Sequence, residues 1–214
     1  MTNISEFYRD YNQDGHWHPY AKKEILRFVP ENGSKVLDVG CGAGSKSKYL
    51  KKENNHVTGI DISAPQIEHA KTALDDARVH DLSERLPFNS EEFDVVFSSA
   101  VLEHLFDYES VLKEMHRVLR IGGRLIVEVP NVSYWPNRFL MLLGRNLIWI
   151  GVGKHIRAFN KHHLKKCISS AGFNNIRILG SILPLPKTKL KIHIPFLKRL
   201  LPGLCFTIFA VAEK

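Results

Sequence analysis

Cysteine is scarce in this sequence. Only three cysteines occur among the 214 residues, Cys41, Cys167 and Cys205, and they are widely spaced and odd in number. Such a set supports neither a disulfide framework nor a CxxC metal site. We therefore expect a protein of a reducing compartment, most simply the cytoplasm.

Long hydrophobic runs are also missing. The longest apolar stretch, residues 139–153, is interrupted by Arg145 and Asn146 and is shorter than the roughly 20 apolar residues that a membrane-spanning helix needs. The first residues, MTNISEFYRDYNQDG, are polar and lack the apolar segment of a secretory signal. The sequence predicts neither a transmembrane helix nor a secretory leader.

Acidic side chains are absent from most of the C-terminal part. Residues 129–212 contain 13 Lys and Arg and no Asp or Glu, whereas residues 1–128 contain 16 basic and 21 acidic residues. The formal net charge of +8 therefore comes from the C-terminal part. A surface without acids of its own is expected to attract anions such as phosphates or acidic lipid headgroups. Alternatively, these cations pair with acidic side chains of the N-terminal part.

The residues that are present alternate between strand and helix patterns. A composition of 44% hydrophobic and 24% charged residues is globular, and the length favours one α/β domain. The repeated alternation predicts a parallel, doubly wound sheet with right-handed crossovers. The expected strands are Val36–Val39, His56–Asp61, Ala77–His80, Phe93–Ser98 and Arg124–Glu128, and the expected helices are Pro19–Val29, Ser45–Glu53, Ala64–Ala73 and Tyr108–Leu119.

The alternation ends after Pro130. Residues 131–153 are aromatic and apolar, and a helix is expected over residues 160–171. Two further strands, Asn175–Ile182 and Cys205–Ala212, are joined by a link rich in proline and lysine. Because no crossover helix separates them, these two strands are most simply antiparallel.

Three glycines follow the first expected strand, in the stretch VLDVGCGAG. Gly40, Gly42 and Gly44 have the spacing GxGxG, which is neither the dinucleotide fingerprint GxGxxG nor a P-loop. Asp61 ends the second strand 21 residues after Gly40, where its carboxylate can accept hydrogen bonds from both hydroxyls of a ribose. The combination predicts an adenosine-type ligand at the carboxyl ends of the strands.

Four ordered segments carry a family resemblance. VLDVGCGAG, GIDIS, LPF…FDVVFSSAVLEHL and EMHRVLRIGGRLIVEVPN resemble the motifs of class I S-adenosylmethionine-dependent methyltransferases of the small-molecule type. The resemblance is close over residues 36–130 and looser as far as Phe173. It implies an α/β, Rossmann-like doubly wound sheet of seven strands, mostly parallel with an antiparallel last strand. It also implies S-adenosylmethionine as the cofactor and a small-molecule acceptor.

The resemblance further implies how the chain is divided. Residues 1–214 are expected to form a single methyltransferase domain. Its parts are an N-terminal helical cap (1–34), a cofactor-binding core (35–130), an acceptor lid with a late helix (131–173) and terminal strands with a basic insertion (174–214).

Residues around the first four strands are implied as cofactor ligands. In the family, the glycine loop runs along the methionine portion, Asp61 holds the ribose, Ile62 packs on the adenine, and Asp81 and the Leu82 amide reach the adenine edge. Two alternatives remain open: Asp38 only ties down the loop, and Ile62 and Leu82 only pack in the core. The implied set is Asp38, Gly40, Cys41, Gly42, Gly44, Asp61, Ile62, Asp81, Leu82 and Ser98.

Candidate acceptor-side residues come from two further segments. His104 can take the proton of a hydroxyl acceptor, or it can simply cap or pack the following helix. Ubiquinone-type O-methyltransferases resemble this stretch and have an ExxEH pattern that implies a divalent metal. Here Glu103 and His104 match but Ala100 replaces the first Glu, so no metal is expected. His155 and Arg157 of KHIRAF can face the acceptor, or they can belong to a solvated helix entry.

Apolar and basic segments suggest the type of acceptor. Residues 134–153 are rich in large apolar groups, and residues 187–204 alternate Lys and His with Leu and Ile. This combination is typical of interfacial binding and favours a lipidic or lipid-linked acceptor, with peripheral contact at an anionic membrane. Alternatively, these segments pack on each other or on a second subunit.

Two other classes of function remain open. The first is a nicotinamide (NAD-type) oxidoreductase, which would require the glycine missing from the fingerprint. The second is a non-catalytic basic binding module. Nucleic acid is not expected as a partner, because the aromatic–basic pattern of RNA readers is absent. The sequence predicts neither the reactive atom of the acceptor nor the oligomeric state.

Overall fold

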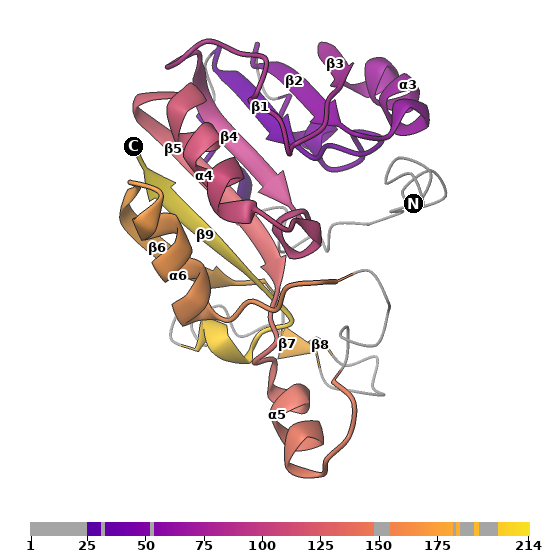
Figure 1. Ribbon diagram of the computed structural model, residues 1–214, viewed down its shortest axis with the longest axis vertical. Helices are drawn as coiled ribbons and strands as arrows, with labels where there is room; N and C mark the ends of the chain where they lie inside the picture. Colours follow the sequence, from indigo (N-terminus) through magenta and orange to yellow (C-terminus); the bar gives the residue numbers. More distant parts are fainter. Residues whose placement is uncertain are drawn as a thin grey trace.

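A seven-stranded sheet forms the centre of the computed structural model, which describes residues 25–30, 33–51, 54–147, 155–181, 183–184, 191–192 and 201–214 (Figure 1). The strands in spatial order are β3 (Asp76–Val79), β2 (His56–Asp61), β1 (Lys35–Val39), β4 (Phe93–Ser99), β5 (Leu119–Pro130), β9 (Thr207–Glu213) and β6 (Asn174–Gly180). The first five strands are parallel, and β9 is antiparallel to both β5 and β6. The expected Rossmann-like sheet with an antiparallel last strand is therefore confirmed.

Helices cover both faces of the sheet. α3 (Ala64–Ala73) packs on one face together with Val36 of β1, and α4 (Tyr108–Val118) and α6 (Lys161–Ser170) pack on the other face together with Leu37. Successive residues of a strand point to opposite faces, so this pairing defines three layers. The strand order reverses between β1 and β4, which places the ligand crevice of such a sheet at their carboxyl ends.

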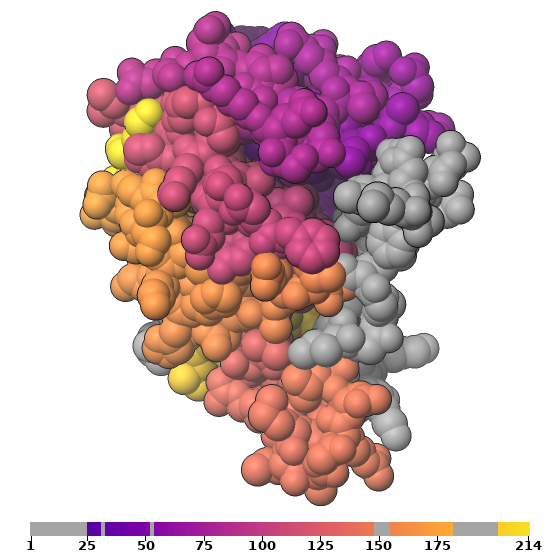
Figure 2. Space-filling model, in the orientation of Figure 1, coloured from indigo at the N-terminus to yellow at the C-terminus, as the bar shows by residue number. Residues whose placement is uncertain are grey.

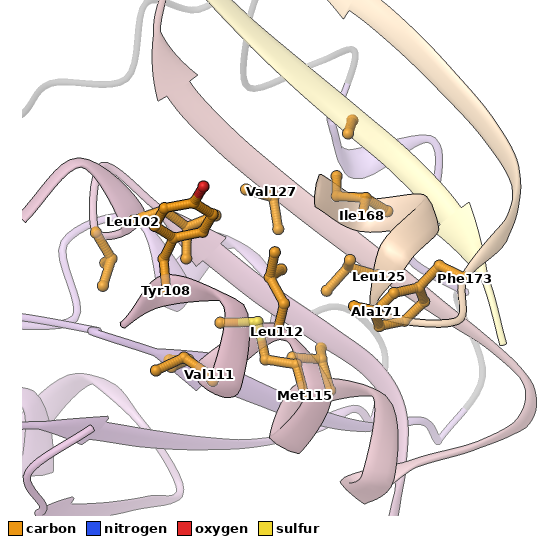
Figure 3. Close-up of a cluster of buried hydrophobic side chains, with 14 of the residues drawn as sticks. Leu102, Tyr108, Val111, Leu112, Met115, Leu125, Val127, Ile168, Ala171 and Phe173 are labelled. Carbon is orange, nitrogen blue, oxygen red and sulfur yellow. The ribbon is translucent and has the colours of Figure 1, made fainter. Parts of the chain in front are cut away.

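The α4–α6 side carries the larger apolar cluster (Figure 3). α4 begins where the Asp107 carboxylate accepts the Ser110 N–H at 3.0 Å, and Leu112 and Met115 on its inner face are fully buried against Leu125 of β5. Burying one such side chain stabilises the fold by about 1.5–3 kcal/mol. This cluster therefore anchors β4 and β5, whose carboxyl ends border the crevice.

The expected strands and helices after β1 are largely confirmed, but β5 extends beyond the expected Arg124–Glu128 at both ends, and one expected helix is missing. The helix predicted over Ser45–Glu53 is wrong for the described part of that segment, where only a 3₁₀ turn, η1 (Ser47–Tyr49), forms. The Ser47 hydroxyl donates to the Asp38 carboxylate, and the Asn55 side chain donates to the Leu50 carbonyl at 3.3 Å. These side-chain bonds hold η1 to β1 and hold Leu50 to the residue that precedes β2.

The segment after β5 projects from the sheet. α5 (Trp135–Leu142) lies beyond the carboxyl end of β5, away from the other helices (Figure 1). β7 (Leu183–Pro184) and β8 (Lys191–Ile192) form a separate two-stranded sheet. Among the helices of the described residues, none is long and apolar enough to cross a membrane.

Several predicted segments lie outside the described residues. They are residues 1–24 of the expected helical cap, residues 148–154 of the expected lid, and most of the basic link between β6 and β9.

Candidate functional site

A narrow cleft opens at the loop between β1 and η1. Gly40 lies at φ +80°, and a Cβ there would come within 2.3 Å of Val101 Cγ2, so the loop can pass this close only as glycine. The Gly40 and Cys41 N–H groups donate to the Ile60 carbonyl at 2.8 and 3.0 Å, which ties the loop to β2. The cleft lining comprises Asp38, Gly40, Cys41, Gly42, Ala43, Ser45, Lys46, Phe97 and Ser99.

Asp61 ends β2 beside this loop. Its Oδ2 accepts the Gly42 N–H and its Oδ1 accepts the Ser63 N–H, both at 2.9 Å. Burial raises the pKa of the carboxyl, and the backbone hydrogen bonds oppose this rise. Because an ionised carboxylate offers about four acceptor positions, two remain for the hydroxyls of a ribose. The position expected from the sequence therefore has the hydrogen-bonding capacity that an adenosine-type ligand requires.

The two residues that follow β3 differ in role. The Asp81 carboxylate accepts the Ser83 N–H at 2.8 Å and is half-buried. The Leu82 side chain is buried in the α4–α6 cluster and packs in the core, and a contact from its backbone amide to the adenine stays a prediction. Ile62 is half-exposed after β2.

Asp38 lies beneath the glycine loop. It is buried, it accepts the Ser47 hydroxyl, and desolvation raises its pKa to about 7. Lys46 and Asp61 also act on it electrostatically, in opposite directions. Asp38 thus fixes η1 to β1, and it also lines the cleft.

Ser98 and its neighbour Ser99 point to different partners. The Ser98 hydroxyl donates to the Val39 carbonyl at 2.9 Å, which holds β4 to β1, whereas Ser99 lines the cleft. Ser99 donates to Glu128 Oε2 at 2.6 Å and accepts from Lys46 Nζ at 2.6 Å, and Lys46 also lies 3.4 Å from Glu128. These three side chains were not predicted from the sequence as a connected set.

The predicted acceptor-side residues come together next to the cleft. η2 (Leu102–His104) follows Val101, which contacts the glycine loop, and the His104 ring lies 4.9 Å from the His155 ring between centroids. Arg157 donates to the Phe106 carbonyl at 2.9 Å. The three residues expected on the acceptor side, far apart in sequence, are therefore neighbours.

Comparison with known proteins agrees with this geometry. The family model described as "Methyltransferase domain" matches residues 37–127. A demethylmenaquinone methyltransferase of Listeria welshimeri is 32% identical over 135 residues, which make up 57% of this chain and 57% of that protein. The chain thus spans little more than half the length of these relatives.

Two further proteins are similar over most of the chain. An S-adenosylmethionine-dependent methyltransferase of Thermotoga maritima has the same fold, with a TM-score of 0.72, 20% identity and coverage of 99% of this chain and 98% of the other. An S-adenosyl-L-methionine-dependent Diels-Alderase of Talaromyces variabilis is 30% identical over 203 residues, covering 82% of this chain and 69% of that protein. Since this identity extends from the glycine loop into the C-terminal half, the chain belongs to the family of class I S-adenosylmethionine-dependent methyltransferases.

Proposed function

We propose that this protein transfers the methyl group of S-adenosylmethionine to a small-molecule acceptor. The observation that carries the proposal is the glycine loop bonded to Asp61, with two acceptor positions of that carboxylate left over. The loop offers close backbone approach without the anion-binding helix start that a pyrophosphate needs, because η1 is a single 3₁₀ turn. A ligand that carries adenosine but no phosphate suits this site.

The glycine loop and the residues at the ends of β2 and β3 would hold different parts of this cofactor. Asp61 would accept the ribose hydroxyls, Asp81 and the Leu82 amide would meet the adenine edge, and the backbone from Gly40 to Gly44 would follow the methionine portion. When bound, S-adenosylmethionine supplies a methyl group on a positively charged sulfur. The protein then has mainly to align the acceptor and exclude water.

On the acceptor side we assign His104, with His155 and Arg157 beside it. For a hydroxyl acceptor, the proton must leave as the oxygen bonds to the methyl carbon. His104 serves this step either by taking the proton itself or by holding a cation that makes the hydroxyl more acidic. Arg157 can pair with an anionic group of the acceptor, since its guanidinium stays charged.

A lipidic acceptor is supported by α5 and the residue that follows it. Phe139, Met141, Leu142 and Leu143 are 60%, 61%, 84% and 54% exposed, an unusual set for four large apolar residues within five positions. Figure 2 shows the α5 segment as the tip of the molecule. Relatives named for demethylmenaquinone also favour a quinone-type acceptor. We therefore include quinones and lipid-linked compounds in the proposed substrate class.

The test is release of S-adenosylhomocysteine. Purified protein is incubated with S-adenosylmethionine and pools of quinones, lipids, glycans and polar small molecules, and the demethylated cofactor is quantified. Release with one pool identifies the acceptor class. Binding of S-adenosylmethionine without its consumption in any pool would contradict methyl transfer and favour a cofactor-dependent reaction of another kind, as the name of the Talaromyces relative describes for that protein.

A further inference from the structure

Three metal-binding side chains converge beside the cleft. Glu103 and His104 end η2, and His155 enters from the segment that follows α5. The Glu103 carbonyl accepts the N–H groups of Ile156 and Arg157 at 3.0 and 3.1 Å. These two backbone bonds fix the His155 segment against η2, so the approach of the three side chains is held by the backbone as well as by side-chain packing.

The Glu103 carboxylate is the unusual member of this group. It is 1% exposed, and neither of its oxygens has a hydrogen-bond partner among the described residues. A buried carboxylate without a partner is costly, and such groups in native proteins are commonly paired with a cation or protonated. Burial raises the pKa of Glu103 to about 8, and Lys46 opposes this rise only in part.

The surrounding charges favour a cation at this position. Lys46 and Glu128 both act electrostatically on Glu103, so two carboxylates face one ammonium group. Lys46 is itself engaged with Ser99 and Glu128 at 2.6 and 3.4 Å. Among the described residues, this ammonium group is therefore hydrogen-bonded to Ser99 and ion-paired with Glu128, and it makes no bond to the Glu103 carboxylate.

The geometry of the donors suits one metal ion. One potential ligand atom from each of Glu103, His104 and His155 lies within 4.8 Å of the others. Three ligands at about 2.1 Å from a common ion lie about 3.4–3.6 Å apart, so rotation of the half-exposed imidazoles must bring the donor atoms about 1 Å closer to close the site. Both histidines are partly exposed, although the Nε2 atom of His104 is itself buried.

We propose that Glu103, His104 and His155 bind one divalent transition-metal cation such as Zn²⁺. Two imidazoles and one carboxylate match the preferences of this class, whereas Mg²⁺ prefers oxygen ligands throughout. Ala100 removes the first donor of the ExxEH pattern, and His155, 55 residues later, provides the third donor instead. A role of this metal in making an acceptor hydroxyl more acidic rests on the proposed methyl transfer. The binding of the metal does not depend on that proposal.

The test uses Co²⁺ as a spectroscopic probe for this site. The full chain is stripped with a chelator and titrated with Co²⁺ and, separately, with Zn²⁺ by calorimetry. We expect one equivalent of each metal to bind, visible absorption bands with Co²⁺, and loss of these bands when Zn²⁺ is added. An affinity reduced at least tenfold in His155→Ala, and unchanged in the exposed control His162→Ala, would support the assignment.

Two results would overturn the metal site. One is the absence of stoichiometric Co²⁺ or Zn²⁺ binding by the folded wild-type protein, and the other is equal binding by His155→Ala and His162→Ala. His155 lies outside the helices and strands, so its replacement should leave the fold intact, as circular dichroism can check. Calorimetry with S-adenosylmethionine on the metal-free protein is run in parallel. Loss of cofactor binding would contradict the proposed function and leave the metal result standing.

Discussion

At the residue scale, the shape of the cleft depends on positions where one added or altered atom would shift the backbone or break one of its hydrogen bonds. Gly40 and Gly122 both have positive φ, +80° and +73°, yet only Gly40 has Val101 in the space of a Cβ. Asp61 and Asp76 are both carboxylates on neighbouring strands, yet only Asp61 bonds to the glycine loop. Comparing Gly40 with Gly122 therefore separates the contact with Val101 from backbone strain alone. Comparing Asp61 with Asp76 separates the bond to the glycine loop from the loss of one negative charge.

Gly40→Ala is expected to destabilise the protein more than Gly122→Ala. Both substitutions force an L-residue into the left-handed region, at about 1–2 kcal/mol each. Only Gly40→Ala also displaces Val101, which adds about 1–3 kcal/mol as overpacking. Urea denaturation of both variants measures the difference in free energy of unfolding. Equal losses would show that the loop can move away from Val101 at little cost.

Asp61→Asn is expected to weaken binding of S-adenosylmethionine at least tenfold. Hydrogen bonds to a charged group contribute about 1.5–3 kcal/mol. In the variant, an NH₂ group that can only donate takes the place of one carboxylate oxygen next to the ribose hydroxyls. Titration calorimetry measures the affinity. Asp76→Asn, whose partner is the exposed Arg78, is the matched control and should bind as the wild type does. If both variants retain full affinity, Asp61 does not hold the ribose.

At the element scale, α5 and the start of β5 provide a test of the lipidic acceptor. Leu142 on α5 is 84% exposed and Ile121 on β5 is 75% exposed, but only Leu142 belongs to an apolar group. Leu142→Glu should reduce flotation with anionic vesicles at least twofold, because a charge interrupts the apolar face and repels the lipid headgroups. Ile121→Glu should float as the wild type does. Equal flotation of the two variants would remove α5 from the proposed membrane contact.

The strands and most helices were predictable because their apolar periodicity is strong. The residues of β2, and those of α3, were identified from the sequence without error in their bounds. The helix over Ser45–Glu53 was wrong because helix-forming composition could not reveal that Ser47 bonds to Asp38. Side-chain hydrogen bonds between distant residues therefore override local preference here.

The part of the candidate site that lies within one sequence motif was predictable. The part that combines segments far apart in the sequence was not. The glycine loop and Asp61 lie within 22 residues of each other and have a recognisable spacing. Lys46, Ser99 and Glu128 meet only through the register of β4 with β5, where Ser99 pairs with Glu128. The approach of His155 to Glu103 depends on the two backbone bonds that join η2 to the segment after His155, and the sequence carries no signal for them.

At the scale of the whole molecule, stability is expected to depend on pH through Asp38. The pKa of this buried carboxyl is about 7 in the folded protein and near 3.9 in the unfolded chain. Between these values the folded state binds more protons than the unfolded state. The free energy of unfolding therefore falls as pH rises from about 4 to about 7, by up to about 1.4 kcal/mol per pH unit for this group.

Asp38→Asn removes this contribution and should flatten the dependence. Urea denaturation of the cofactor-free protein at pH 5, 6 and 7 gives the slope directly. The variant should lose less stability than the wild type across this range, because an amide stays neutral and can still accept the Ser47 hydroxyl. Asp76→Asn, on the half-exposed end of β3, should keep the slope of the wild type. Parallel curves for the wild type and Asp38→Asn would mean that Asp38 is ionised in the fold, stabilised by Lys46 and Ser47 against its burial.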